Sequence, residues 1–147
     1  DVDPIDLAEA FYAGIDYGAV EYTDGAEEAI EVAASHGPVG IITNGPAHRQ
    51  AAKLQTLELT DRLDGIVYAG DLPRRKPHVD PFEAAIDGLG VDSGRTLYVG
   101  NSLRYDVAGA HNAGLASAWY SPGDDDPDPY TPDHILRDLR GLGGLLG

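Results

Sequence analysis

The chain has 147 residues, which is enough for one domain with a single core. Its 25 acidic and 10 basic residues give a net charge of −15, so nucleic acid and anionic membrane surfaces are unfavourable partners. The absence of cysteine excludes disulfides and thiolate chemistry, and no apolar run approaches the roughly 18 residues of a membrane-spanning helix.

The kinds of charged residue are also informative. Eighteen of the acids are aspartate, and the chain has only two lysines. This composition fits either an acid-rich cytoplasmic protein or a salt-adapted one, and we favour the second because Asp-rich, Lys-poor surfaces are typical of extreme halophiles. We find no signal peptide and expect a cytoplasmic location. Since the chain contains no methionine, we expect it to be a processed or excised piece.

The N-terminal part predicts two helices. Residues 6–15 (DLAEAFYAGI) have a helical pattern, and residues 23–37 form a stronger one. In the second, Asp24 and Glu27 form a capping-box pair and Gly37 ends the helix. Its apolar face consists of Ala26, Ala29, Ile30 and Ala33.

The middle of the chain alternates strands with helices. Residues 39–42 (VGII) read as a short buried strand that ends at Thr43-Asn44-Gly45, and Pro46 starts a helix. Residues 65–70 (GIVYAG) are the next strand, and a basic turn, residues 72–77 (LPRRKP), follows it.

The C-terminal half continues this alternation. Asp80-Pro81 caps a helix with Glu83 as the reciprocal partner, and Phe82, Ala85, Ile86 and Leu89 form its apolar stripe. The remaining predicted elements are a strand at 96–100, a helix at 102–113 closed by Gly114, a strand at 115–120, a solvated acidic loop at 122–133, and a last short strand and glycine-weakened helix.

This order of elements predicts an α/β fold with a doubly wound parallel sheet. In such sheets, ligands bind outside the carboxyl ends of the strands. The polar residues just beyond the predicted strand ends are Thr43 and Asn44, Asp71 to Lys76, and Asn101 to Asp106. We therefore expect any functional site to be formed by these three loops.

The residue types in these loops suit a phosphoryl group held with a divalent cation. Thr43 and the backbone N–H groups of the helix that starts at Pro46 would donate to phosphate oxygens. Lys76 would neutralise the anion, and Asp106, helped by Asn101, would offer oxygen to Mg²⁺. Each residue also has a structural interpretation: a turn and helix cap at 43–45, a solvated carboxylate at 106, and a surface charge at 76.

Other polar residues are weaker candidates. Arg74, Arg75 and Arg104 read as solvent-facing. The five histidines lack metal-ligand spacing, and only His48 and His78 lie close enough in sequence to the predicted loops to be weak site candidates. The sequence pattern shows neither a Ser-His-Asp set nor a glycine-rich phosphate loop.

At these residues the sequence resembles the haloacid dehalogenase-like (HAD) hydrolase superfamily, which implies a Rossmann-like core. VGIITNG resembles the second motif, in which Thr43 binds the phosphoryl group. RRKPHVDPFEAAIDGLGV resembles the third, in which Lys76 steadies the phosphate and the nucleophile. LYVGNSLRYDVAGAHNAG resembles the fourth, the metal-binding loop. The resemblance runs from about residue 24 to the end of the chain.

The fourth motif departs from the family pattern at Asn101, where aspartate is usual, so the affinity for Mg²⁺ is expected to fall. The five-residue step from Asn101 to Asp106 matches the phosphatase-like form of the family. The dehalogenase form also has an asparagine in this motif, but with a shorter step to its aspartate.

The larger departure is the first motif, Asp-x-Asp-x-Thr at the end of an apolar strand, which supplies the nucleophile. The only near match is Asp1 and Asp3, with no preceding strand and with Ile5 in place of the threonine. We expect instead that residues 1–22 are a remnant of a helical cap and that residues 23–147 are the core. The central strand of the sheet would then be missing, leaving a gap, a collapsed pairing or a strand supplied in trans.

The resemblance implies a parent protein that is a Mg²⁺-dependent phosphatase of small phosphorylated metabolites, working through an aspartyl-phosphate. The 147-residue chain alone is expected to be inactive. Two alternatives remain: a 2-haloacid dehalogenase, and a non-catalytic binding module that kept the fold.

Overall fold

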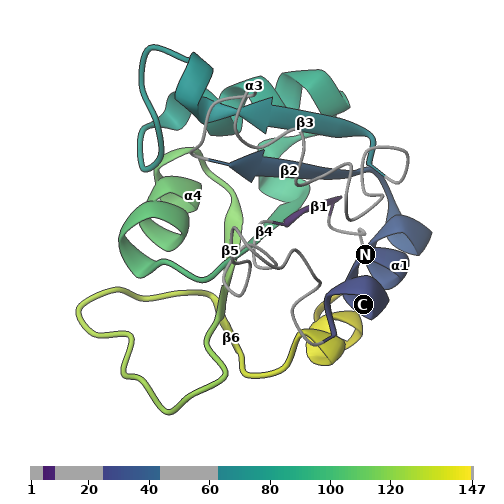
Figure 1. Ribbon diagram of the computed structural model, residues 1–147, viewed down its shortest axis with the longest axis vertical. Helices are drawn as coiled ribbons and strands as arrows, with labels where there is room; N and C mark the ends of the chain where they lie inside the picture. The colour runs from purple at the N-terminus through teal and green to yellow at the C-terminus, as the bar shows by residue number, and fades with distance from the viewer. Residues whose placement is uncertain (1–4, 9–24, 44–62, 147) are drawn as a thin grey trace, which may run out of the picture.

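The computed structural model describes residues 5–8, 25–43 and 63–146. Its centre is a six-stranded parallel sheet with strand order β3-β2-β1-β4-β5-β6 (Figure 1). The strands are β1 (Ile5–Ala8), β2 (Val39–Thr43), β3 (Gly65–Tyr68), β4 (Thr96–Gly100), β5 (Ala116–Tyr120) and β6 (His134–Leu136). The predicted doubly wound α/β fold is confirmed. No helix within the described ranges has the length and apolar character needed to cross a bilayer.

The predicted gap in the middle of the sheet is wrong, because β1 fills it. Leu7 pairs with Gly40 of β2 on one side and with Tyr98 of β4 on the other. Residues 6–8 are therefore a strand and not the start of the expected helix, and they belong to the sheet and not to a cap remnant. The rest of that predicted helix, and the predicted domain boundary at residue 22, lie outside the described residues.

The prediction failed because the neighbouring strands, and not the local sequence, determine the structure of this segment. Ile-Asp-Leu-Ala has no strong preference of its own, whereas β2 and β4 both present rows of backbone N–H and C=O groups toward the space between them. Buried backbone groups need hydrogen-bond partners, so a short segment that can pair with both strands is stabilised there whatever its local pattern.

Helices cover both faces of the sheet. On one face, α1 (Ala26–His36) lies beside the 3₁₀ helix η6 (Leu139–Leu145), as the violet-blue and yellow ribbons of Figure 1 show. On the other face lie α3 (Val79–Leu89) and α4 (Ala108–Asn112). Alternate strand residues face these two layers: Leu97 and Val99 belong to the core under α1, and Tyr98 belongs to the core under α3 and α4.

The helices begin slightly later than expected, or with different caps. Gly25, in the left-handed region at φ 82°, precedes α1 and provides no side-chain cap, and the predicted cap Asp24 lies outside the described residues. The residue before α3 is His78, so Asp80 lies in its first turn and does not cap it. The predicted helix at 102–113 is a π-helical turn, η5 (Leu103–Val107), continued by α4. The helix predicted to begin at Pro46 lies outside the described residues.

One arginine holds the first part of the acidic loop before β6. Its acidic residues are exposed, as predicted. Arg137 Nη1 donates to the carbonyl oxygens of Gly123 at 2.7 Å and Ser121 at 3.3 Å, and Arg137 Nη2 donates to that of Asp125 at 3.4 Å. The guanidinium also lies over the ring of Trp119, 5.7 Å from its centroid.

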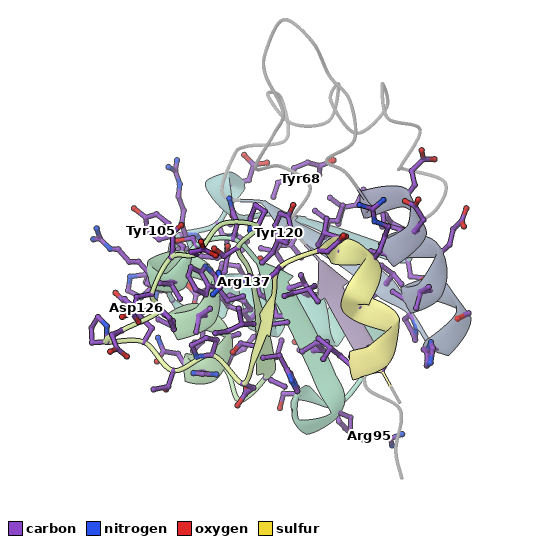
Figure 2. The ribbon with its side chains drawn as sticks, turned by 90° about the horizontal axis from the view of Figure 1, so that it is seen from below. Tyr68, Arg95, Tyr105, Tyr120, Asp126 and Arg137 are labelled. Carbon is purple, nitrogen blue, oxygen red and sulfur yellow. The ribbon has the colours of Figure 1, made fainter. Side chains whose placement is uncertain are left out.

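The carboxyl ends of the strands form one edge of the molecule. Figure 2 shows this edge through Tyr68 and Tyr120, the last residues of β3 and β5, while Arg95, which precedes β4, lies at the opposite edge. The loops that contain Lys76 and Asp106 leave β3 and β4 at the carboxyl edge. This is where the sequence places the candidate site.

Candidate active site

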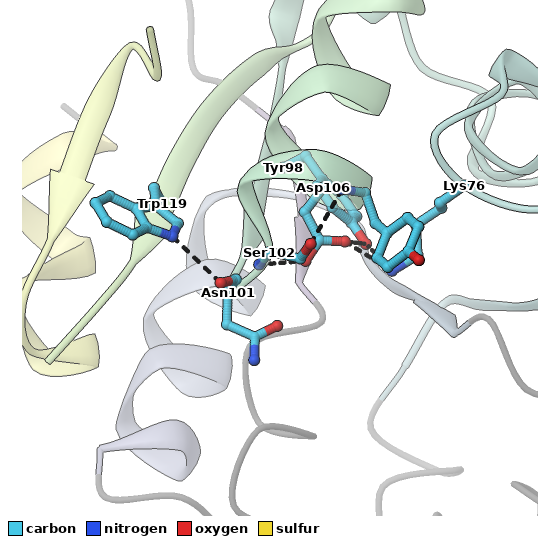
Figure 3. Close-up of polar contacts among 7 residues, drawn as sticks. Lys76, Tyr98, Asn101, Ser102, Asp106 and Trp119 are labelled. Atoms are coloured by element: carbon cyan, nitrogen blue, oxygen red, sulfur yellow. Dashed lines mark hydrogen bonds and ion pairs between the residues drawn. The ribbon is translucent and has the colours of Figure 1, made fainter. Parts of the chain in front are cut away.

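Lys76 and Asp106 form a buried ion pair at this edge. Lys76 lies between η3 (Ala69–Asp71) and α3, and Asp106 lies in η5. The Lys76 Nζ and Asp106 Oδ1 atoms are 2.7 Å apart, and the two residues are only 5% and 1% exposed (Figure 3). The structural interpretations of Lys76 as a surface charge and of Asp106 as a solvated carboxylate are therefore wrong. Two charges 30 residues apart in sequence share one site.

Tyr98 completes this cluster from β4. Its hydroxyl accepts a hydrogen bond from Lys76 Nζ at 3.2 Å and donates one to Asp106 Oδ1 at 3.3 Å. The ring packs edge-on against Phe82 of α3, with centroids 5.0 Å apart. The sequence pattern does not single out Tyr98, because a tyrosine within an apolar strand has the same pattern as a core residue.

The loop after β4 holds Asp106 through its own backbone. The N–H of Ser102 donates to Asp106 Oδ2 at 2.9 Å, and the hydroxyl of Ser102 accepts from the N–H of Tyr105 at 3.0 Å. The carbonyl of Ser102 accepts from the N–H groups of both Asp106 and Val107, which produces the π-helical turn. Such turns are rare and are frequent at functional sites.

Gly100 makes room for the Asp106 carboxylate. A Cβ atom at residue 100 would overlap the Cβ, Cγ and Oδ2 atoms of Asp106. Any side chain at this position would therefore push the carboxylate away from the end of β4. The glycine before the loop is needed for this close approach and not for an unusual backbone angle.

Burial and charge act in opposite directions on Lys76. Burial lowers the pKa of Lys76 below its ordinary value, and the charge and hydrogen bond of Asp106 offset part of that effect. The carboxylate is thus what makes an ammonium tolerable in this environment. Loss of one partner of such a pair leaves an uncompensated charge and costs far more than the intact pair contributes.

Thr43 and Asn101 lie at the same level on either side of β1. Leu7 pairs with both Gly40 and Tyr98, and Thr43 and Asn101 each come three residues later on those neighbouring strands. Two strand spacings separate their backbones, which is roughly 10 Å. The Thr43 side chain and Asn44 lie outside the described part of the structure, so the expected phosphate contacts of Thr43 and Asn44 stay predictions.

Asn101 directly follows β4, at the start of the loop that contains Asp106. Its side chain is exposed, and its backbone carbonyl oxygen accepts a hydrogen bond from Trp119 Nε1 at 3.2 Å. In Figure 3, Asn101 lies between Trp119 and Asp106 at the end of β4. Trp119 therefore fixes the start of the loop, leaving the Asn101 amide able to face a ligand.

The oxygen donors present fit a magnesium ion only in part. Both carboxylate oxygens of Asp106 already accept hydrogen bonds, and among residues 5–8, 25–43 and 63–146 no cluster of three or more His, Cys, Asp or Glu side chains occurs. Asp106 is therefore primarily the counterion of Lys76, and Asn101 is the residue whose side-chain oxygen is accessible to a metal ion. Mg²⁺ is compatible with few protein ligands because it keeps several waters.

The other polar candidates do not join this cluster. Arg74 makes a two-pronged ion pair with Asp80, at 3.0 and 2.9 Å, on the exposed side of the loop. Arg75, His78 and Arg104 are exposed, and the Arg104 guanidinium lies 5.4 Å from the centroid of the Tyr105 ring. His48 lies outside the described residues.

The structure also assembles a serine, a histidine and an aspartate that the sequence pattern did not reveal. Ser117 Oγ and Asp133 Oδ2 lie 2.9 and 3.1 Å from the same ring nitrogen of His111, Nε2. A catalytic relay uses the two different ring nitrogens, so this is not a triad. The cluster lies at the amino end of β5, away from the carboxyl edge.

This cluster anchors the loop that enters β6. The backbone N–H of Ser117 donates to Asp133 Oδ2 at 2.8 Å, and the N–H of Asp133 donates to Ser117 Oγ at 3.1 Å. Partial burial raises the pKa of Asp133, but the hydrogen bonds from Ser117 and His111 outweigh it and hold the pKa below its ordinary value.

Comparison with known proteins decides the family. The family model of the haloacid dehalogenase-like hydrolases matches residues 6–120, from β1 to the end of β5. The chain belongs to this family. The matched range includes Lys76, Asn101 and Asp106.

Individual HAD proteins resemble the chain over about half of their own length. A phosphoglycolate phosphatase of Xanthomonas campestris pv. campestris (strain 8004) is 35% identical over 119 residues, which are 78% of this chain and 53% of the relative. The HAD-hydrolase YfnB of Bacillus subtilis, solved with bound magnesium, matches with a TM-score of 0.82 and 26% identity, over 88% of this chain and 58% of that one. A 2-haloacid dehalogenase of Pseudomonas syringae pv. Tomato DC3000 matches with a TM-score of 0.76 and 30% identity, over 86% and 53%.

Proposed function

We propose that this chain is the phosphate-binding part of a Mg²⁺-dependent HAD phosphatase that acts on small phosphorylated metabolites. The observation that carries this proposal is the buried Lys76–Asp106 pair at the carboxyl edge of the sheet, next to the strand that ends at Thr43. An ammonium kept in a water-poor site acts on a dianionic ester much more strongly than one in solvent.

Each residue has a distinct proposed task. Lys76 neutralises the phosphoryl group, and Asp106 holds the ammonium in place. The Thr43 hydroxyl and Asn44 donate to the phosphoryl oxygens from the end of β2. Asn101, with Asp106 behind it, contributes to holding Mg²⁺, which supplies charge neutralisation at the phosphate when bound.

The sequence does not contain the Asp-x-Asp-x-Thr motif that would supply the nucleophile. In an aspartyl-phosphate mechanism, the attacking carboxylate lies just beyond the strand at the position of β1. The residues that follow Ala8 are Glu9, Ala10 and Phe11, while Asp1 and Asp3 come before the strand. We therefore expect the 147-residue chain to bind phosphate without turning over an ester, and a parent protein with the first motif to be active.

Phosphate binding by the chain tests this proposal directly. Titration with inorganic phosphate, followed by calorimetry, is expected to give saturable binding that Lys76→Met weakens by about 100-fold, the scale for losing one preorganised charge. Arg75→Met is the matched control, because it removes an exposed charge one residue away and is expected to change binding less than twofold. Equal effects of the two variants would contradict the assignment of Lys76.

Activity assays complete the test. Hydrolysis of p-nitrophenyl phosphate with Mg²⁺ is expected from a parent protein and not from the 147-residue chain. Robust turnover by the 147-residue chain alone would show that it contains a nucleophile, contrary to this proposal. Saturable phosphate binding without turnover by any longer form would instead favour the non-catalytic binding module.

A dehalogenase is the second candidate function, favoured by the 30% identity to the enzyme of Pseudomonas syringae and by Asn101 in the fourth motif. In that reaction a carboxylate displaces halide from carbon, and water then releases a 2-hydroxy acid. Halide release from 2-chloropropionate that survives EDTA would support this function, whereas the five-residue step to Asp106 argues against it.

A further inference from the structure

We propose that Tyr98 is a positioning residue that fixes the direction in which the Lys76 ammonium points toward the phosphate. This inference rests on the proposed phosphate site and adds to it a residue whose side chain lies behind the ion pair. Tyr98 acts through Lys76 and Asp106 and does not itself touch the substrate.

The geometry is a closed triangle of polar atoms. Lys76 Nζ lies 2.7 Å from Asp106 Oδ1 and 3.2 Å from the Tyr98 hydroxyl oxygen, and that oxygen lies 3.3 Å from Asp106 Oδ1. The hydroxyl therefore contacts both charges of the pair at once. Figure 3 shows the three side chains meeting at this point.

Tyr98 is itself held rigidly. It is 1% exposed, its ring meets Phe82 edge-on at an interplanar angle of 77°, and it belongs to the core under α3 and α4. A side chain packed in this way cannot follow the lysine if the ammonium moves. Its hydroxyl is a fixed point against which the longer, more flexible lysine side chain is oriented.

Two acceptors constrain an ammonium in a way that one does not. A lysine bound only to one carboxylate oxygen can still rotate about its Cε–Nζ bond and shift its side-chain torsions. The Tyr98 oxygen gives Nζ a second acceptor at 3.2 Å, beside the carboxylate oxygen at 2.7 Å, so the ammonium cannot shift away from Asp106 without losing this contact as well. Preorganised donors of this kind accelerate reactions because no reorganisation is needed when charge develops.

The choice of tyrosine at this buried position supports the same conclusion. Phenylalanine would fill the same core space without burying a hydroxyl, and a buried hydroxyl is unfavourable unless it is hydrogen bonded. Here the hydroxyl contacts the two charged groups of the site and lies at the carboxyl edge of the sheet. The oxygen contributes to the ion pair, whereas the ring contributes to the core.

The experiment uses the 147-residue chain labelled with ¹⁵N at its lysine side chains. Only two lysines are present, Lys53 and Lys76, so two ammonium signals are expected. Tyr98→Phe is compared with Thr96→Val, which also removes one buried hydroxyl from β4; that hydroxyl donates to the carbonyl of Asp92 at 2.7 Å, at the amino end of the strand. Circular dichroism verifies that both variants fold.

The expected result separates the two variants. Tyr98→Phe is expected to speed the exchange of the Lys76 ammonium protons with water about tenfold and to raise the dissociation constant for inorganic phosphate by a similar factor, as for one hydrogen bond to a charged group. Thr96→Val is expected to change both values less than twofold. Equal effects of the two variants, or an unchanged Lys76 signal in Tyr98→Phe, would overturn the proposal.

Failure of the phosphate site itself has a different outcome. If inorganic phosphate does not shift the Lys76 signal of the wild-type chain, the proposed function fails, but the exchange rates still decide whether Tyr98 holds the ammonium. Should Tyr98→Phe not fold, the wild-type chain gives the answer. A nuclear Overhauser effect between the Tyr98 hydroxyl proton and the Lys76 ammonium is expected, and its absence would overturn the contact.

Discussion

Replacement of Asp106 by asparagine is the sharpest test of the buried pair. The change leaves the Lys76 ammonium, in a residue only 5% exposed, beside a neutral amide of the same shape. Removal of one partner from a buried ion pair costs about 3–5 kcal/mol in the free energy of unfolding. For a domain of this size each 1 kcal/mol lowers Tm by about 2–4 °C, so Asp106→Asn is expected to lower Tm by about 6–20 °C.

The loss of stability is also expected to depend on pH. Burial holds the pKa of Lys76 in the folded chain below its ordinary value of 10.5, so at pH values between the lowered and the ordinary pKa the unfolded chain binds more protons than the folded one. The free energy of unfolding therefore rises with pH through this window. Asp106→Asn removes the negative charge that offsets the effect of burial on Lys76, so this pH window extends to lower pH in the variant. The difference in the free energy of unfolding between the variant and the wild type should therefore narrow as the pH rises.

The measurement is urea unfolding followed by the fluorescence of Trp119, the only tryptophan in the chain. A double variant, Lys76→Met with Asp106→Asn, removes both charges and is expected to recover most of the lost stability. Asp138→Asn, on an exposed pair with Arg140, is the control and is expected to change little. A single variant as stable as the wild type, or a double variant less stable than the single one, would refute the account of the pair.

Four further outcomes follow from the same structure. Gly100→Ala is expected to lower the free energy of unfolding by about 1–3 kcal/mol through its overlap with Asp106, whereas Gly94→Ala, where the added Cβ meets no atom within 4 Å, should be near neutral in the same urea assay. Asn101→Asp is expected to tighten Mg²⁺ binding about tenfold by calorimetry, since it adds a charged oxygen ligand; unchanged binding would remove Asn101 from the metal site. The pKa of Asp133 is held below its ordinary value, so the carboxylate stabilises the fold at a pH above its ordinary pKa, and this stabilisation is lost as the pH falls through the lowered pKa. In this acidic range, the free energy of unfolding of Asp133→Asn should therefore depend less steeply on pH than that of the wild type. Raising KCl from 0.1 to 1 M is expected to raise Tm, because the Debye length falls from about 10 to about 3 Å and screens the repulsion of a chain with net charge −15; a lower Tm would argue against salt adaptation.

That Lys76 and Asp106 lie close together was predictable from their positions along the chain. Lys76 and Asp106 follow strands whose apolar residues identify them, and the carboxyl ends of parallel strands meet at one edge. Their burial was not predictable from the same pattern, because turn residues with charged side chains are usually solvated. It follows from the packing of η5 against the end of β4 and of Phe82 in α3 against the Tyr98 ring.

The contacts that the sequence did not reveal join residues far apart in the chain. Tyr98 meets Lys76 across 22 residues, and Ser117 meets Asp133 across 16. Neither spacing corresponds to the repeat of a helix or a strand, so sequence periodicity does not predict these contacts. The cap of α3 was predicted wrongly for a related reason, because where a helix begins depends on how the preceding loop packs.

Apolar periodicity and turn residues were sufficient to predict a parallel α/β sheet and the polar loops at its carboxyl edge, because these signals act over a few residues along the chain. The place of Ile5–Ala8 in the centre of the sheet, and the role of Tyr98 beside the ion pair, were not accessible in this way. Both depend on hydrogen bonds offered by distant segments, and such bonds form only when the whole chain is folded.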